Sequence, residues 1–259
     1  MKKIIATVIS MVGLLAFTSL AHAAAATGIA ATKHNLRSTG SSGLKGTTDE
    51  ICIYCHTPHG GKKAIADDTG PLWNREATAG PFTVYASYTL DTSPSNPPTS
   101  VSKACLSCHD GTLGLNQLIN NAGPGSGTNP ANGTDTKMGG TGFTNNMALI
   151  GTDLRDDHPV SIIYNDAKSY GTGAAIGTDS NAAGFTTASL SGTRPVVVNG
   201  TITLPLYGTA TANGKVECAS CHDPHEERSK TGAADPTKSV YFLRINNDGS
   251  QLCLTCHLK

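Results

Sequence analysis

The sequence predicts a mostly irregular coil with short helices and few short strands, arranged in two duplicated modules around bound groups rather than around a side-chain core. Three observations lead to this fold class. The 259 residues include only 5% aromatic and 15% charged residues, with 29 glycines, which leaves little material for an apolar core. All eight cysteines fall into one repeated motif. The same series of motifs and histidines occurs twice along the chain.

Residues 1–23 have the features of a secretory signal peptide. Lys2 and Lys3 precede an apolar run from residue 4 to residue 17, and a small-x-small end covers Ala21 to Ala23. The apolar run is too short to cross a membrane, and no later segment approaches the roughly 20 apolar residues that a span requires. We therefore expect an exported protein that begins near Ala24 and has no transmembrane segment.

The net charge argues against a nucleic-acid-binding protein. The whole chain has 19 basic and 19 acidic side chains, and removal of Lys2 and Lys3 with the signal peptide leaves a net charge of about −2. Nucleic-acid binding requires a basic face. We therefore expect no nucleic-acid partner.

Four C-x-x-C-H motifs account for every cysteine. The first to fourth motifs are Cys52, Cys55 and His56; Cys105, Cys108 and His109; Cys218, Cys221 and His222; and Cys253, Cys256 and His257. This pattern is the attachment sequence of c-type haem. Two thiols three residues apart can bond to the two vinyl groups of one porphyrin, and the adjacent imidazole then ligates the iron. The sequence thus predicts a stack of four covalently attached haem c groups.

Three other uses of the cysteines account for less of the pattern. Disulfides are common in exported proteins, but they give no reason for a histidine after every second cysteine. Structural zinc would use the cysteines in fours and leave the four histidines unexplained. A thioredoxin-like redox motif needs one C-x-x-C in a βαβ setting, which four copies in a glycine-rich chain do not resemble.

The number of remaining histidines equals the number of predicted haems. Of nine histidines, His22 leaves with the signal peptide and four belong to the motifs. The spare histidines are His34, His59, His158 and His225. We expect them to be the second axial ligands, which would give four six-coordinate irons. Met138 and Met147 could replace a histidine at one or two sites.

The first and third motifs continue as C-x-x-C-H-x-P-H, which adds His59 and His225. Residues three apart on a short turn project to the same side, whereas the two ligands of one iron approach from opposite faces. His59 and His225 therefore cannot serve the haem of their own motif. We predict that His59 serves the haem of the second motif and that His225 serves the haem of the fourth.

The order spare histidine, C-x-x-C-H-x-P-H, plain C-x-x-C-H occurs twice and defines two two-haem modules. The first covers residues 24–115, a Gly/Pro/Asn-rich connecting loop covers residues 116–157, and the second covers residues 158–259. The motifs are expected on short helices. A hairpin is predicted in "RPVVVNGTITLPL" around Asn199-Gly200, and a short strand in "HPVSIIY" from His158 to Tyr164.

These motifs, together with "KHNL" near the predicted mature start, resemble the multihaem c-type cytochromes of metal-respiring bacteria. The similarity is greatest to the tetrahaem extracellular cytochromes that polymerise into nanowires. The motifs that carry it lie at the two ends of the mature chain, and the middle is similar only in composition. The resemblance implies a location outside the cell or on its surface rather than in the periplasm, and a homopolymeric filament.

Two arrangements remain open for His34 and His158. In one, His158 ligates the haem of the first motif, and His34 ligates the haem of the third motif in the adjacent subunit. Repeated without closure, that contact builds a filament, and the resemblance favours it. In the other, each histidine ligates the first haem of its own module and the chain is a self-contained monomer.

Irons with two histidine ligands have no open position for a substrate, so the sequence predicts electron transfer and not an enzyme. The first hypothesis is an extracellular conduit that passes electrons to other cytochromes or to extracellular acceptors, and the resemblance implies that it forms filaments. The alternatives are a monomeric periplasmic electron shuttle and, against the histidine count, a multihaem reductase.

Overall fold

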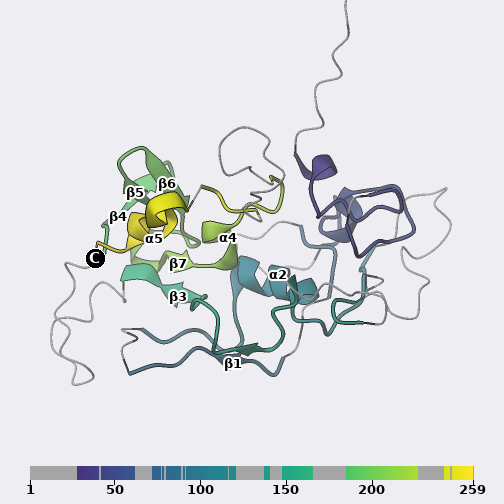
Figure 1. Ribbon diagram of the computed structural model, residues 1–259, viewed down its shortest axis with the longest axis horizontal. Helices are drawn as coiled ribbons and strands as arrows, with labels where there is room; N and C mark the ends of the chain where they lie inside the picture. Colours follow the sequence, from purple (N-terminus) through teal and green to yellow (C-terminus); the bar gives the residue numbers. More distant parts are fainter. Residues whose placement is uncertain are drawn as a thin grey trace, which may run out of the picture.

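Short helices and strands are separated by long irregular segments in the part of the chain that the structure describes (Figure 1). The structure is a computed structural model, and it describes residues 28–40, 42–61, 72–76, 78, 80–88, 90, 92–115, 117–120, 137–140, 148–165, 185–226, 242–245 and 247–258. The predicted signal peptide lies outside these residues. None of the helices within them has the length and apolar character that a membrane span requires.

The described helices are all short. The α-helices are α2 (Ser100–His109), α4 (Cys218–Cys221) and α5 (Gln251–Cys256), and the 3-10 helices are η1 (Ile29–Ala31), η2 (Cys52–Tyr54), η7 (Thr211–Asn213) and η8 (Asp248–Ser250). Each C-x-x-C-H motif lies on one of these helices or directly after it, as the sequence predicts. The helix α2 begins after Thr99, which is extended, and ends before Gly111, whose φ of +74° stops a right-handed helix.

The described strands form three small sheets. The strands are β1 (Thr83–Val84), β2 (Asp153–Leu154), β3 (Ile162–Ile163), β4 (Ala188–Ser191), β5 (Arg194–Asn199), β6 (Ile202–Pro205) and β7 (Lys215–Val216). β1 pairs with β2 in parallel, β3 pairs with β7 antiparallel, and β4, β5 and β6 form an antiparallel sheet in that order.

The predicted hairpin is confirmed as β5 and β6. Asn199 pairs with Ile202, so the two-residue turn consists of Gly200 and Thr201, one residue later than predicted. Gly200 has a φ of +60°, which a residue with a side chain rarely adopts. The sheet also contains β4, which the sequence did not predict, because its Ala-Ser-Leu-Ser stretch is mostly exposed and lacks β-branched residues.

The strand predicted from His158 to Tyr164 is shorter than expected. Only Ile162 and Ile163 form β3, and His158 lies before it. The predicted loop of residues 116–157 also contains regular structure, because Asp153 and Leu154 form β2 beside β1. The glycine-rich part of that loop, residues 121–136, lies outside the described residues.

Apolar side chains gather in several small clusters rather than in one core. The largest described clusters are Leu36, Leu44, Ile53, Tyr54 and Leu115, and Ile162, Tyr164, Val197, Leu206 and Val216. Cysteines of the first and second motifs pack against the first cluster, and Cys256 packs against the second. Three of the four motifs therefore pack against apolar clusters. In Figure 1, α5 lies over β5 and β6 at one end, and α2 and α4 lie next to each other near the centre.

Candidate haem-binding site

Each C-x-x-C-H motif brings two thiols and one imidazole to the same side of a helical turn. The histidine amide N–H donates to the carbonyl of the first cysteine at 2.8, 3.0 and 2.9 Å in the first, third and fourth motifs. The second motif forms the C-terminal end of α2. Positions i, i+3 and i+4 share one face of a helix, so the thiols and the histidine of a motif can contact one flat group together.

The motifs follow one another in space in the order of the chain. Burial raises the pKa of Cys55 in the first motif to about 12, and the nearby Cys108 of the second motif contributes to the increase. A hydrogen bond joins Cys105 of the second motif to Cys218 of the third; it lowers the pKa of Cys218 and raises that of Cys105. The first three motifs are thus in direct succession.

The fourth motif continues this series. Burial raises the pKa of Cys221 in the third motif to about 11, and Cys218 and then Cys253 of the fourth motif add to it. Cys52 and Cys253, in the first and last motifs, are exposed, whereas the other six cysteines are half-buried. The series therefore begins and ends at the protein surface.

Three pairs of histidine rings lie at similar distances, and each pair combines a motif histidine with a spare histidine. The rings are nearly parallel in the pair of His56 and His225, at 13°, and inclined at 69° in the other two pairs. The distances between ring centroids are 6.1 Å for His56 and His225, 6.1 Å for His34 and His109, and 6.5 Å for His158 and His257. Ring contacts in proteins commonly have centroids about 4.5–7 Å apart, so one such pair would mean little. Because each of the three pairs combines a motif histidine with a spare histidine, one metal bound between the rings of each pair would explain all three.

The spacing fits one metal atom between the rings of each pair. A five-membered ring with bonds of about 1.33 Å has a radius of about 1.1 Å, and a metal–imidazole bond is about 2.0–2.1 Å long. Two imidazoles on opposite sides of one metal therefore have centroids about 6.3 Å apart. The observed distances of 6.1 and 6.5 Å lie on either side of that value.

The second ring nitrogen of several histidines is already bonded to an oxygen. The Nδ1 partners and distances are Pro224 O at 3.0 Å for His34, Ala148 O at 2.7 Å for His109, Pro159 O at 3.0 Å for His158, and Asp223 Oδ1 at 3.3 Å for His225. Such a bond fixes the tautomer and ring orientation of a metal-ligating histidine and leaves Nε2 for the metal. Burial also lowers the pKa of His56 and of His109, which favours the neutral imidazole that a metal binds.

The histidine pairs differ from those that the sequence suggested. His225 lies beside His56 of the first motif and not beside the fourth, whose His257 faces His158 instead. The ring of His34 lies 6.1 Å from that of His109 in the same chain, whereas the sequence suggested a haem of the third motif in an adjacent subunit. The sequence prediction paired each C-x-x-C-H-x-P-H turn with the other motif of its own module. In the structure the turn after the third motif lies against the first motif, which belongs to the other module.

His59 is exposed, and the described contacts hold its backbone. Its carbonyl oxygen accepts hydrogen bonds from Thr57 Oγ1 and from Asn120 Nδ2, both at 2.9 Å. Asn74 donates in turn to the carbonyl oxygen of Asn120 at 2.8 Å. The turn after the first motif is therefore fixed to a distant part of the chain, with the imidazole of His59 at the surface.

Sequence reasoning missed the aromatic neighbours of the paired histidines. Phe242 stacks on His34 with ring centroids 4.3 Å apart, Trp73 meets His56 edge-on at 6.2 Å, and Phe185 lies 4.8 Å from His257. The chain has five phenylalanines and one tryptophan, and three of these six side chains lie beside the paired histidines. The small number of aromatic residues was the only feature of the sequence that could have drawn attention to these three, because none of them lies near a C-x-x-C-H motif in sequence.

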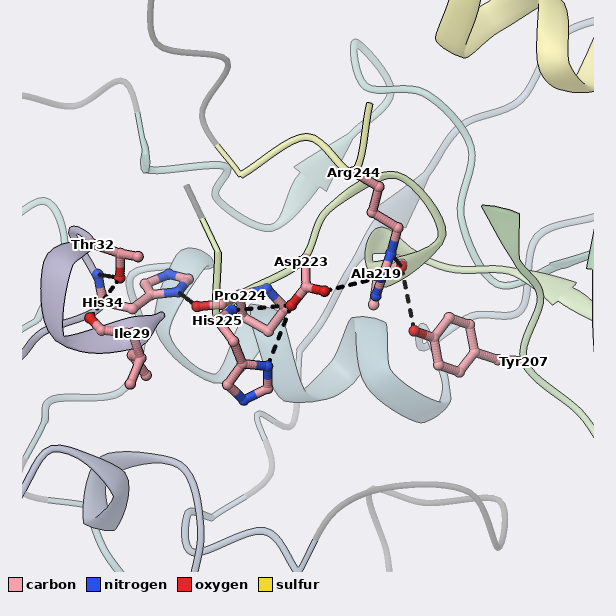
Figure 2. A network of polar contacts seen from close by, with 9 residues as sticks. All are labelled: Ile29, Thr32, His34, Tyr207, Ala219, Asp223, Pro224, His225 and Arg244. Carbon is pink, nitrogen blue, oxygen red and sulfur yellow. Dashed lines mark hydrogen bonds and ion pairs between the residues drawn. The ribbon is translucent and has the colours of Figure 1, made fainter. Parts of the chain in front are cut away.

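A polar network supports the third motif and the His225 turn (Figure 2). Arg244 donates from Nε to Ala219 O at 2.8 Å, inside the motif, and from Nη1 to Asp223 Oδ2 at 3.0 Å. Asp223 also accepts from the His225 amide N–H at 3.1 Å. Partial burial acts to raise the pKa of Asp223, but the hydrogen bonds from His225 and the charge of Arg244 outweigh it and lower that pKa. The carboxylate is thus ionised and pairs with Arg244.

Glu217 joins the second and third motifs. Its carboxyl group is 1% exposed and accepts hydrogen bonds from Ser102 of α2, from Ser161 at 2.9 Å and from Thr99 at 3.3 Å. Ser102 also accepts from the amide N–H of Cys218 at 2.9 Å. Burial raises the pKa of Glu217 to about 7 despite these bonds. A carboxyl group that the sequence does not mark therefore fixes α2 against α4.

No family model matches this chain, and no relative was found among curated proteins.

Proposed function

We propose that this chain binds four haem groups covalently and transfers electrons through them. The observation that carries the proposal is the set of three imidazole pairs, each with the spacing of two ligands on one metal and each containing the histidine of a C-x-x-C-H motif. The cysteine pairs of the four motifs would form the thioether bonds. Bound haem supplies an iron that gains and loses one electron.

From these pairs we propose axial ligands at three motifs. His225 with His56 serves the first motif, His34 with His109 the second, and His158 with His257 the fourth. The turn that carries His225 leaves the third motif and reaches the first. We further propose that His59, on the matching turn of the first motif, serves the third motif together with His222, because His59 is the one spare histidine that none of the three pairs uses. This reciprocal arrangement uses all eight histidines.

Ligation on both faces supports electron transfer over catalysis. Two imidazoles on one metal leave no position for a substrate, so the residues around each site bind, orient and shield the group without taking part in bond chemistry. A reductase would need a motif whose second face lacks a ligand. The pairs at the first, second and fourth motifs argue against that alternative.

The succession of motifs supports a path from one surface to another. Cysteines of adjacent motifs are close enough to change each other's pKa, and the exposed Cys52 and Cys253 mark the two ends. We propose that electrons enter and leave at these ends, where another cytochrome, an extracellular acceptor or a second copy of the chain can dock. Head-to-tail filaments outside the cell fit this arrangement, and a monomeric periplasmic shuttle is the alternative. Electron microscopy of the purified protein distinguishes filaments from single particles.

The proposal is tested by measuring haem content and coordination in the purified protein. Acid extraction should leave the colour on the polypeptide, with four haems per chain by the pyridine haemochrome assay. The spectrum should be low-spin, and carbon monoxide should not bind to the reduced protein. Haem that is extracted, or a ratio clearly below four, contradicts the attachment chemistry. A high-spin signal would instead favour the reductase.

A further inference from the structure

Arg75 is a fully buried cation between the first and second motifs. Its exposure is 0%, and it donates from Nη1 to Leu115 O at 3.2 Å and from Nη2 to Gly114 O at 2.7 Å and Ser107 O at 3.5 Å. Ser107 lies inside the second motif. Asn74, the residue before Arg75, donates its amide N–H to the carbonyl of Cys55 in the first motif at 2.9 Å. Arg75 is therefore close to the cysteines of two motifs at once.

No ion pair neutralises this charge among the residues that the structure describes. The partners of Arg75 are backbone carbonyls, and its Nε is buried without a hydrogen-bond acceptor. Asp110, which follows the second motif, accepts hydrogen bonds from the backbone and side chain of Thr112 instead. A buried charge without a counter-charge acts strongly on its surroundings, because little solvent screens it.

Arg244 shows the contrasting case at the third motif. It also donates to a carbonyl inside a motif, that of Ala219, but Asp223 pairs with it at 3.0 Å and offsets its charge. Glu217 lies between the second and third motifs and so does not distinguish them. Among the described residues Arg75 is the only buried basic side chain, so a buried cation that is not offset by an ion pair occurs beside the first two motifs and not beside the third or fourth.

We propose that Arg75 is a potential-setting residue, which makes the groups attached at the first and second motifs easier to reduce than those at the third and fourth. This inference rests on the proposed function. Each reduction adds one electron to a metal centre, and a fixed guanidinium stabilises the added negative charge without taking up a proton. At equilibrium a single electron in the protein then resides at the first or second motif. Electron transfer along the four motifs is therefore favourable toward the first two.

The test is a redox titration of the four-haem protein in which each midpoint potential is resolved. Arg75→Met removes the charge and keeps an apolar stem, and we expect two of the four midpoints to fall. Arg75→Lys keeps the charge, and we expect those two midpoints to stay close to the original. Arg155→Met is the matched control, because the Arg155 side chain is 65% exposed and pairs with Asp153 at the surface; it should leave all four unchanged.

Four unchanged midpoints in Arg75→Met, or an equal shift of all four, overturns the inference. If Arg75→Met fails to fold, the order of the midpoint potentials in the natural protein tests the inference instead. The haem whose methyl protons show nuclear Overhauser contacts to the Trp73 indole belongs to the first motif, since Trp73 meets His56 edge-on. That haem must be among the two most easily reduced, and the opposite order refutes the role of Arg75. Absence of covalent haem would contradict the proposed function instead.

Discussion

The rings of His56 and His225 lie within 13° of parallel, with their centroids 6.1 Å apart. The two residues are 169 positions apart and come from different predicted modules. Their contact places the turn after the third motif against the first motif. It also makes the assignment of axial ligands testable by single substitutions.

Replacement of His225 by alanine should open the site at the first motif. The iron attached at Cys52 would lose one ligand and become high-spin, and the reduced protein would bind about one carbon monoxide per chain. Electron paramagnetic resonance and carbon monoxide titration measure this. His158→Ala is the matched comparison and should open the fourth motif. If His225→Ala opens the fourth motif instead, or His158→Ala opens the first, the pairing given by the structure is wrong.

Replacement of His34 by alanine should open the second motif by loss of a ligand from the same chain. Since His34 faces His109 within one molecule, the spin state of the unmodified protein should not change on dilution. Optical spectra over a hundredfold range of protein concentration check this. A high-spin fraction that grows on dilution would show that a ligand comes from another subunit.

Stability should fall as the pH rises from about 4.5 to 7 because of Glu217. Burial raises its pKa from the usual 4.5 to about 7, so in this range the folded state holds a proton that the unfolded state has lost. The free energy of unfolding then decreases with pH and levels off above the folded pKa, by a total on the order of 3 kcal/mol. Urea unfolding midpoints should show this fall, and Glu217→Gln should reduce it.

Glu217→Ala serves as the contrasting variant, because it removes the hydrogen bonds to Ser102 and Ser161 as well as the titration. It should be less stable than Glu217→Gln at every pH. Equal pH dependence in the natural protein and in Glu217→Gln would show that another group controls it.

Leu206→Ala should lower the free energy of unfolding by about 2–5 kcal/mol, because it leaves a cavity in the apolar cluster around Val197. The Leu206 side chain is 2% exposed and packs with Val197 and Tyr164. Its matched control is Leu190→Ala, at a leucine that is 55% exposed and for which we expect a change within about 0.5 kcal/mol. Chemical denaturation measures both values. Similar losses in both variants would contradict the clusters described above.

The sequence predicts local features of this protein better than distant contacts. The hairpin of β5 and β6 follows from Gly200 and the flanking β-branched residues, and the motifs lie on short helices as expected. Both depend on residues close together in the chain. The sheet partner β4 was missed, because its exposed residues show no alternation of apolar and polar positions.

The histidine pairs show where sequence reasoning fails. Composition and counting select the eight histidines, but which ring faces which depends on how α2 and α4 pack and on where the His225 turn returns. Buried polar groups decide this packing, and a single Glu217 or Arg75 is indistinguishable in sequence from a surface charge. The pairing of distant motifs therefore required the structure.

The hydrogen bond between Cys105 and Cys218 has a consequence for how the protein matures. The two thiols come from different motifs and are in contact, and the bond stabilises the thiolate of Cys218, the form that attacks oxidised sulfur. In an oxidising compartment these two thiols are therefore prone to close a disulfide. If haem is attached as proposed, such a disulfide would block two attachment sites together, and thioether formation would have to precede thiol oxidation for the protein to mature.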